Sequence, residues 1–215
     1  MTMSNLIQSK EDYANSTSVP TADQLSLKLV LEYYDAYVEP YIYTYIGKNE
    51  ENITLKFAYS NFPHLIGVHY AANAKYGRNS DKAKKFRGYP AYESIKNGTM
   101  DKQTIKSIYP KKNEYYKDMT KKMRYFFTIH KVLEDPEAVY YNKEKNEKKK
   151  NNDIDCDILL YKFIHNQYIH VGLDKSGDKY VAKPFLIEPS PIFIDGQTII
   201  EIEKTEKVRH RRGPA

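Results

Sequence analysis

The chain has 215 residues, with 34 Lys and Arg against 28 Asp and Glu and a formal charge of +6, a length that suits one domain with short tails. Hydrophobic residues make up 40% of the chain, which argues against wholesale disorder. Cys156 is the only cysteine, so an internal disulfide and a cysteine-based zinc site are excluded, as are Gly-rich phosphate loops, because no such motif is present.

The N-terminal quarter predicts a leader, one helix and a hairpin. Residues 1–21 are polar and without periodicity, so we expect a flexible leader. Asp23 can cap a helix with a broad apolar face, and Pro40 ends it. The β-prone run Tyr41–Ile46 and the alternating run Ile53–Ala58 are separated by turn residues, which is typical of a hairpin.

The middle of the chain is predicted to be helical, around a basic loop at Lys75–Gly88. The expected helices begin at Asn61 or Ser60 and run to about Ala72, then cover Pro90–Lys96, Asp101–Ile108 and Asn113–Leu133.

The last third of the chain changes to strand periodicity. The expected strands are Ala138–Tyr141, Ile154–Ile164, Tyr168–Leu173, Tyr180–Ile187 and Thr198–Ile202. Short turns between them indicate an antiparallel meander. We therefore predict an α+β fold, with a single domain at 22–203 and a disordered basic tail at 204–215.

His64 and His69 lie in the densest motif of the chain, Asn61–His69. On a continuous helix they would point about 140° apart, and a metal-binding pair needs a spacing of three or four. We therefore expect no metal site and no cofactor. One histidine beside a basic cleft suits acid–base catalysis, because its pKa lies near neutrality; a histidine hydrogen-bonded within a packing face is the alternative.

Basic residues gather in two stretches interleaved with aromatic residues, which is how proteins hold phosphates and unpaired bases. The candidate RNA-binding residues are Lys84, Lys85, Arg87, Lys121, Lys122 and Tyr125, and the second stretch also includes Lys111 and Lys112. A solvated helix face and an exposed loop would give the same pattern. The 21 tyrosines and the sequence pI of about 9.0 fit polyanion binding, and they fit an AT-rich genome equally well.

Arg124 differs from its lysine neighbours, because a guanidinium can hold a phosphate or a buried carboxylate in a rigid fork. Asp157, in an apolar strand, is its expected structural partner. Lys162 interrupts the same strand and is expected to face outward or into a cleft. Cys156 is interpreted as a small strand residue, since no base partner or helix N-terminus is predicted beside it.

Four features of the chain belong together: the string Phe62-Pro63-His64-Leu65-Ile66-Gly67-Val68-His69, the Tyr-rich strand before it, the later Tyr125-Phe126 and the strand at 154–160. Together they resemble the PBECR domains of phages and mobile elements, most closely the fourth group. These domains belong to the barnase–EndoU–colicin–RelE superfamily. The resemblance covers about Tyr41 to Ile202. It implies a BECR-like fold in which an N-terminal hairpin and helices pack on a four- to five-stranded antiparallel sheet.

The resemblance also implies a metal-independent ribonuclease that cleaves RNA by attack of the 2′-hydroxyl. His64 matches the motif histidine and is expected to be the acid or the base. Arg124 and Lys162 are candidates for phosphate stabilisation, and His69 and Ser190 are secondary candidates.

The leading hypothesis is a toxin or effector of a phage or mobile-element conflict system. Its partners would be RNA, single-stranded or tRNA, and an antitoxin or immunity protein. The alternative is a non-catalytic RNA- or protein-binding module, an inhibitor or defence component, on the same fold. The chain has neither the n- and h-regions of a signal peptide nor an apolar run long enough to span a membrane, so we expect a cytoplasmic protein without membrane partners.

Overall fold

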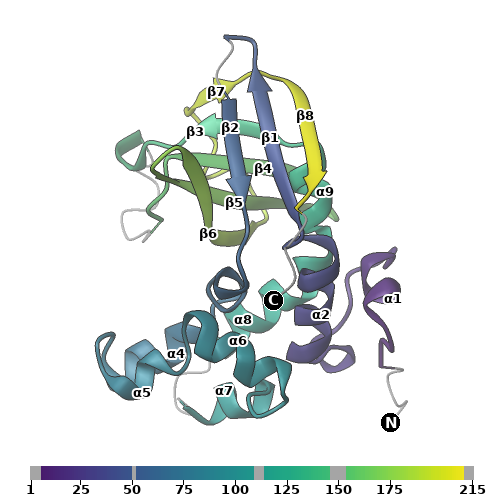
Figure 1. Cartoon of the computed structure of the whole chain (residues 1–215), viewed down its shortest axis with the longest axis vertical. Coiled ribbons are helices and arrows are strands. Elements are labelled where there is room, and N and C mark those ends of the chain that lie inside the picture. Colours follow the sequence, from purple (N-terminus) through teal and green to yellow (C-terminus); the bar gives the residue numbers. More distant parts are fainter. Residues whose placement is uncertain (1–5, 50–51, 109–113, 146–153, 211–215) are drawn as a thin grey trace. The chain divides into compact units, whose positions relative to one another are not determined.

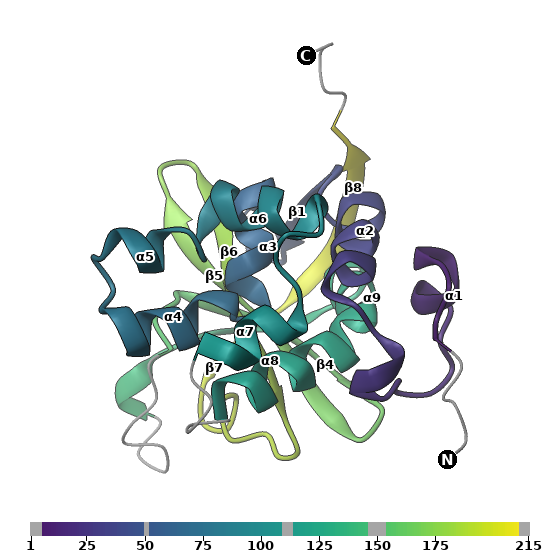
Figure 2. The same ribbon diagram turned by 90° about the horizontal axis from the view of Figure 1, so that it is seen from below.

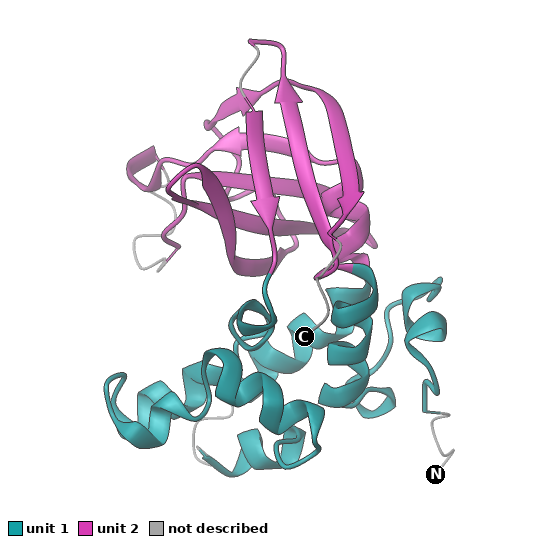
Figure 3. Ribbon diagram, viewed as in Figure 1, with its two compact units in different colours: residues 1–37, 58–127 teal, residues 38–57, 128–215 magenta. Residues whose placement is uncertain are grey.

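The computed structural model describes residues 6–49, 52–108, 114–145 and 154–210. The chain divides into two compact units, each assembled from separate stretches of sequence (Figure 3). Unit 1 comprises residues 1–37 and 58–127, and unit 2 comprises residues 38–57 and 128–215. The single domain predicted at 22–203 includes parts of both units, and its boundaries stay a prediction.

Unit 1 is helical over its described residues (Figure 1). Its α-helices are α1 (Lys10–Ala14), α2 (Leu27–Tyr37), α3 (Phe62–Leu65), α4 (Val68–Tyr76), α5 (Asp81–Lys84), α6 (Gly88–Lys96), α7 (Lys102–Ile108) and α8 (Glu114–Tyr125), with the 3-10 turns η1 (Ala22–Gln24) and η2 (Tyr59–Asn61). The helical character predicted for the middle of the chain is therefore confirmed. The predicted loop at Lys75–Gly88 contains the end of α4 and the whole of α5.

Helix α1 lies within the segment that was expected to be a flexible leader. The Ser9 hydroxyl caps it by accepting a hydrogen bond from the Asp12 N–H at 3.0 Å. The Tyr13 side chain is fully buried, and its hydroxyl donates to the Met123 carbonyl and accepts from the Phe127 N–H. The expectation failed because one buried tyrosine anchors a segment that is otherwise polar.

Tyrosine forms much of the core of unit 1, which explains part of the excess in the composition. Tyr33 and Tyr34 of α2 are fully buried. Their hydroxyls donate to the carbonyls of Phe127 at 3.0 Å and of Ala58 at 2.7 Å. A buried hydroxyl is costly unless it is hydrogen-bonded, so these rings contribute apolar area while each hydroxyl ties α2 to another segment of the unit.

Unit 2 contains, within the described residues, an eight-stranded sheet with the order β7-β3-β4-β5-β6-β2-β1-β8. The strands are β1 (Tyr41–Gly47), β2 (Asn52–Lys56), β3 (Glu137–Tyr140), β4 (Ile158–Ile164), β5 (Gln167–Ser176), β6 (Lys179–Glu188), β7 (Thr198–Ile200) and β8 (Ile202–Arg209). The α+β class, the hairpin β1–β2 and the antiparallel meander β3–β6 are confirmed. The predicted number of four to five strands is wrong, and β2 joins β6 in parallel.

The two edge strands β7 and β8 are consecutive in the sequence, with only Glu201 between them. A sheet whose opposite edges are joined by one residue must curl until those edges approach each other, as Figure 1 shows. Residues up to Arg209 pair with β1 in β8 instead of forming the disordered tail expected at 204–215. Charged side chains are common on edge strands, so the charge of this segment was misread as a sign of disorder.

The predicted helix Asn113–Leu133 is divided into α8, the turn η3 (Phe126–Thr128) and α9 (Ile129–Glu134). Helix α9 packs on β4, β5 and β8 within unit 2. The Tyr45 hydroxyl of β1 donates to the Leu133 carbonyl at 3.1 Å. Across the described ranges, none of the helices is both long enough and apolar enough to cross a membrane.

Candidate functional site

The candidate site is built around a break between two helices of unit 1. The sequence predicted one continuous helix through residues 61–72, but α3 ends at Leu65 and α4 begins at Val68. Gly67 lies between them with φ +80°, a left-handed conformation that favours glycine. Helix α4 also contacts α8, and α3 contacts α6, so four helices meet around this break (Figures 1 and 2).

The break brings His64 and His69 together. Their rings are stacked, with centroids 4.6 Å apart and planes 14° from parallel. The expectation that they would point to different sides assumed a continuous helix and is wrong for this reason. His64 is half-buried, whereas His69 is 5% exposed, and the Tyr70 ring lies 4.2 Å from the His69 ring.

His69 is held in its neutral form. Burial, followed by the charges of the neighbouring His64, Lys122 and Arg87 in that order of effect, lowers its pKa to about 3. A hydrogen bond to the Pro63 backbone acts in the opposite direction. Proline has no N–H, so the His69 ring donates to the Pro63 carbonyl. Nδ1 is buried without a partner among the described residues, which leaves Nε2 as the donor.

Two cations complete this group. Lys122 of α8 is only 4% exposed, and its ammonium pairs with Asp118 at 3.0 Å and lies 5.1 Å from the centre of the Tyr70 ring. Burial of an ammonium is costly unless it is paired, and Asp118 supplies the pair. Arg87 is the other cation. We call His64, His69, Tyr70, Arg87 and Lys122 the Gly67 cluster.

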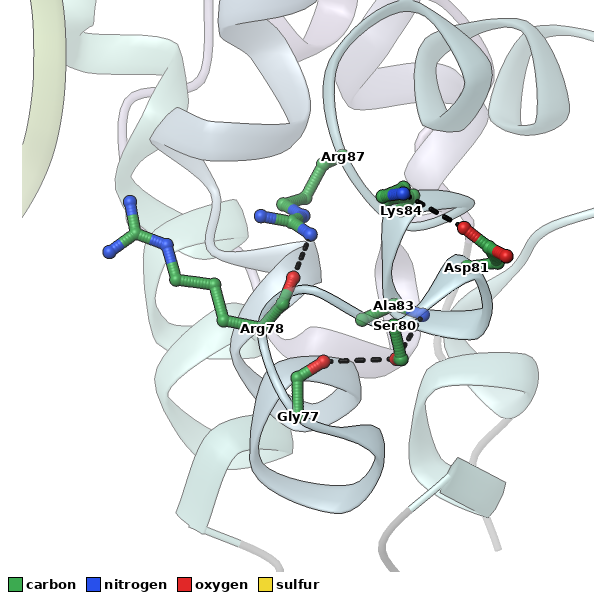
Figure 4. A network of polar contacts seen from close by, with 7 residues as sticks. All are labelled: Gly77, Arg78, Ser80, Asp81, Ala83, Lys84 and Arg87. Carbon is green, nitrogen blue, oxygen red and sulfur yellow. Dashed lines mark hydrogen bonds and ion pairs between the residues drawn. The ribbon is translucent and has the colours of Figure 1, made fainter.

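Arg87 is anchored by the loop that precedes α6. Its Nη2 donates to the Arg78 carbonyl, while its Nε is buried without a partner among the described residues (Figure 4). Within α5, Lys84 pairs with Asp81 at 2.8 Å, and Lys85, the next residue, is exposed. Arg87 therefore belongs to the cluster, whereas Lys84 and Lys85 lie on the surface of the α5 segment.

The other candidates of unit 1 have separate surroundings. Arg124 Nε donates to the Pro20 carbonyl at 2.7 Å, so this guanidinium holds the segment before α2. Its expected partner Asp157 accepts from the Lys175 N–H at 2.7 Å. Because Arg124 belongs to unit 1 and Asp157 to unit 2, their pairing stays a prediction. Lys121 and Tyr125 are half-buried on α8. The candidates Lys111 and Lys112 lie outside the described residues.

Lys162 and Ser190 belong to unit 2. The Lys162 ammonium donates to the Asp135 carbonyl at 2.9 Å and also pairs with the Asp135 carboxylate. Ser190 is exposed in the bend that follows β6. The catalytic candidates are therefore divided between the two units, and their roles stay predictions.

The Cys156 thiol bears on nucleophilic catalysis, and the acidic and histidine side chains bear on metal binding. Burial, followed by the charge of Asp157, raises the pKa of the Cys156 thiol to about 12, so it is a poor nucleophile at neutral pH. No group of three or more His, Cys, Asp or Glu side chains within the described ranges is arranged to hold a metal ion.

Sequence reasoning missed Tyr70 and Asn73. Tyr70 contacts both His69 and Lys122. Asn73, one turn after His69, has a buried Oδ1 with no partner in the described part of the chain. The signal that could have revealed the arrangement is Gly67, because a glycine between two helical runs favours a break and a change of direction.

Replacing Gly67 with alanine should disturb the cluster, and Gly98, directly after the C-cap of α6, provides the control. The two glycines have φ +80° and +79°, but a Cβ on Gly67 would lie 2.9 Å from the Tyr70 ring, whereas a Cβ on Gly98 would meet nothing within 4 Å. We expect Gly98→Ala to lower the free energy of unfolding by about 1 to 2 kcal/mol and Gly67→Ala by about 1 kcal/mol more. Urea unfolding measures both, and equal losses would contradict the close contact.

Comparison with known families places this arrangement in context. The model of the phage-Barnase-EndoU-ColicinE5/D-RelE like nuclease 4 domain (PBECR4) matches residues 30–211. Comparisons with curated proteins and with solved structures gave no significant match. The match covers most of the chain and agrees with the resemblance carried by the Phe62–His69 string. The chain therefore belongs to the PBECR4 family of nucleases.

Proposed function

We propose that this protein is a metal-independent endoribonuclease. The observation that carries the proposal is the Gly67 cluster, in which a half-buried His64 is stacked on a neutral His69 beside two cations. An acid–base group beside positive charge is what cleavage of a phosphodiester through its own 2′-hydroxyl requires. Membership of a nuclease family supports cleavage of a phosphodiester.

In the proposed reaction a base takes the proton of the ribose 2′-hydroxyl, and the oxygen attacks the adjacent phosphorus. The P–O5′ bond breaks, and an acid protonates the leaving 5′-oxygen. The products are a 2′,3′-cyclic phosphate and a 5′-hydroxyl. We assign His64 to one of the two proton transfers. His69 orients the His64 ring by stacking, since its own pKa of about 3 keeps it neutral.

We assign stabilisation of the charged phosphorane to Lys122 and Arg87. Lys122 is buried beside the Tyr70 ring, where its charge is less screened by water than on the surface. Arg87 adds a second positive charge to the cluster, and this charge acts on His69, whose pKa it lowers. Arg124 and Lys162 are weaker candidates, because neither belongs to the Gly67 cluster: Arg124 Nε donates to the Pro20 carbonyl, and Lys162 pairs with Asp135 in unit 2.

We further propose that the nuclease acts as a toxin or effector in conflicts between phages or mobile elements and their hosts. The phage origin in the name of the PBECR4 family supports this role. A toxin that cleaves cellular RNA requires an antitoxin or immunity protein in the cell that makes it.

The test is incubation of the purified protein with RNA in EDTA, followed by mapping of the product ends. We expect cleavage that leaves 2′,3′-cyclic phosphates, and no cleavage of the same sequence made with 2′-deoxyribose. Intact single-stranded RNA and tRNA at high concentrations of folded protein would refute the nuclease proposal. Salt-dependent RNA binding without cleavage would favour a non-catalytic module instead.

A further inference from the structure

Three tyrosine rings of unit 1 form a ladder that ends at the surface. The ring centroids of Tyr59 and Tyr92 are 4.6 Å apart, and those of Tyr92 and Tyr89 are 6.0 Å apart, with interplanar angles of 30° and 20°. These values are typical of offset stacking. Tyr92, in the middle, is 1% exposed, whereas Tyr89, at the outer end, is 56% exposed. The ladder therefore presents the ring of Tyr89 to solvent.

The ladder is held in place by polar contacts. The Tyr92 hydroxyl donates to the Asp35 carboxylate at 2.7 Å, and the Lys96 ammonium lies 5.6 Å from the centre of the Tyr92 ring. A hydrogen bond to Glu93, one turn along α6, raises the pKa of the Tyr89 hydroxyl. A ring fixed in this way loses little conformational entropy when a flat ligand stacks on it.

The outer end of the ladder follows Arg87 of the Gly67 cluster closely in the chain. Tyr89 follows Arg87 by two residues, so their Cα atoms lie within about 7.6 Å of each other. Gly88, between them, faces η2, since a Cβ placed on it would lie 3.9 Å from the Ser60 Cβ. Turn η2 leads directly into α3, which carries His64. A phosphate held by Arg87 would therefore place a neighbouring nucleotide near Tyr89.

A single exposed tyrosine needs no special explanation, but a rigid stacked ring beside a cationic cluster is the arrangement that binds unpaired bases. We propose that Tyr89 is the stacking platform for an unpaired nucleobase of the substrate. The inference rests on the proposed RNA-cleaving function and specifies its substrate class as single-stranded RNA. Bases within a duplex are already stacked on one another and offer no free face.

The absence of tryptophan from the chain allows a direct test. Tyr89→Trp introduces a single tryptophan at the end of the ladder, and a stacked base should quench its fluorescence. The probe is a single-stranded 2′-O-methyl RNA, which lacks the attacking hydroxyl and stays intact. We expect quenching by this probe, and little quenching by an abasic strand of equal length or by a duplex of the same sequence.

Phe163→Trp is the matched control, because Phe163 is 52% exposed and also lies against another aromatic ring, that of Tyr168, at 4.8 Å. Equal quenching in both variants, or quenching of Tyr89→Trp by the abasic strand, would overturn the platform. Quenching of Tyr89→Trp by a tyrosine-rich or acidic peptide but not by RNA would also overturn it, in favour of a protein partner.

Variants without tryptophan separate this inference from the proposed function. Tyr89→Leu should weaken binding of the 2′-O-methyl probe roughly 5- to 100-fold, and Tyr89→Phe should preserve it, because base stacking requires the flat ring. Equal effects of the two variants would overturn the platform. Selective binding at Tyr89 together with inactivity on RNA would support the platform and refute the nuclease. RNA cleavage at an unchanged rate in Tyr89→Leu, together with no quenching in Tyr89→Trp, would support the nuclease and refute the stacking role of Tyr89.

Discussion

His64→Ala should reduce RNA cleavage by about 10²- to 10⁴-fold, the range in which a positioned acid or base contributes to catalysis. The loss should fall mainly on kcat, because the cations that bind the phosphate, Lys122 and Arg87, are unchanged. His64 is half-buried and its ring stacks on His69, so the variant is expected to remain folded. Single-turnover cleavage of a fluorescent RNA, together with circular dichroism, measures both properties.

His165→Asn is the matched histidine control. His165 lies in the turn between β4 and β5 with φ +50°, and asparagine tolerates this left-handed conformation well. We expect its activity to remain within about threefold of the wild type. Equal losses in the two variants would indicate a general effect of removing a histidine, and full activity of His64→Ala would remove His64 from the mechanism.

The sequence could predict the elements of the fold wherever the apolar pattern is strong. Alternation in Ile53–Ala58 and in Tyr168–Leu173 led to strands that the structure confirms. The eighth strand was missed because Lys204, Glu206 and Lys207 lie on an edge strand, where the apolar pattern that marks a buried strand is absent. The closing of the sheet was missed for the same reason, since it depends on β8 being a strand.

The candidate site was predictable as a set of residues but not as a geometry. His64, His69, Arg87 and Lys122 were all singled out from the sequence. The proximity of His64 and His69 depends on the left-handed backbone at Gly67. On a continuous helix the two side chains would point to different sides, whereas the break at Gly67 lets their rings stack. Periodicity also could not distinguish the buried Lys122 from its neighbour Lys121, because the side chain that pairs with a lysine depends on packing.

The tyrosines of unit 1 occupy two kinds of position, which together explain part of the tyrosine excess in the composition. Tyr13, Tyr33 and Tyr34 combine full burial with hydrogen-bonded hydroxyls, so they belong to the core of unit 1. Tyr70 and Tyr89 are exposed and lie beside or near cationic side chains. The tyrosine excess therefore serves packing in the first group, and we propose that it serves substrate binding in the second.

The low pKa of His69 links the site to stability. In the unfolded chain a histidine titrates near pH 6.5, whereas burial and the nearby His64, Lys122 and Arg87 lower the pKa of His69 in the folded chain to about 3. Between these values the unfolded state binds a proton that the folded state does not. The contribution of His69 to the free energy of unfolding is therefore complete above about pH 7 and decreases as the pH falls toward 3.

As the pH falls from 7 to 4, His69 should take up a proton in the unfolded chain but not in the folded chain. With these two pKa values, we expect this uptake to lower the free energy of unfolding by about 3 kcal/mol. Carboxylates also titrate in this range, so the decisive quantity is the difference between wild type and His69→Gln in urea unfolding at each pH. Glutamine can still donate to the Pro63 carbonyl but does not titrate. Its curve should therefore be flatter than that of the wild type. Parallel curves of unfolding free energy against pH for wild type and His69→Gln would mean that the folded protein takes up a proton at His69 as readily as the unfolded chain does. His69 could then not act in the mechanism as the neutral ring that orients His64.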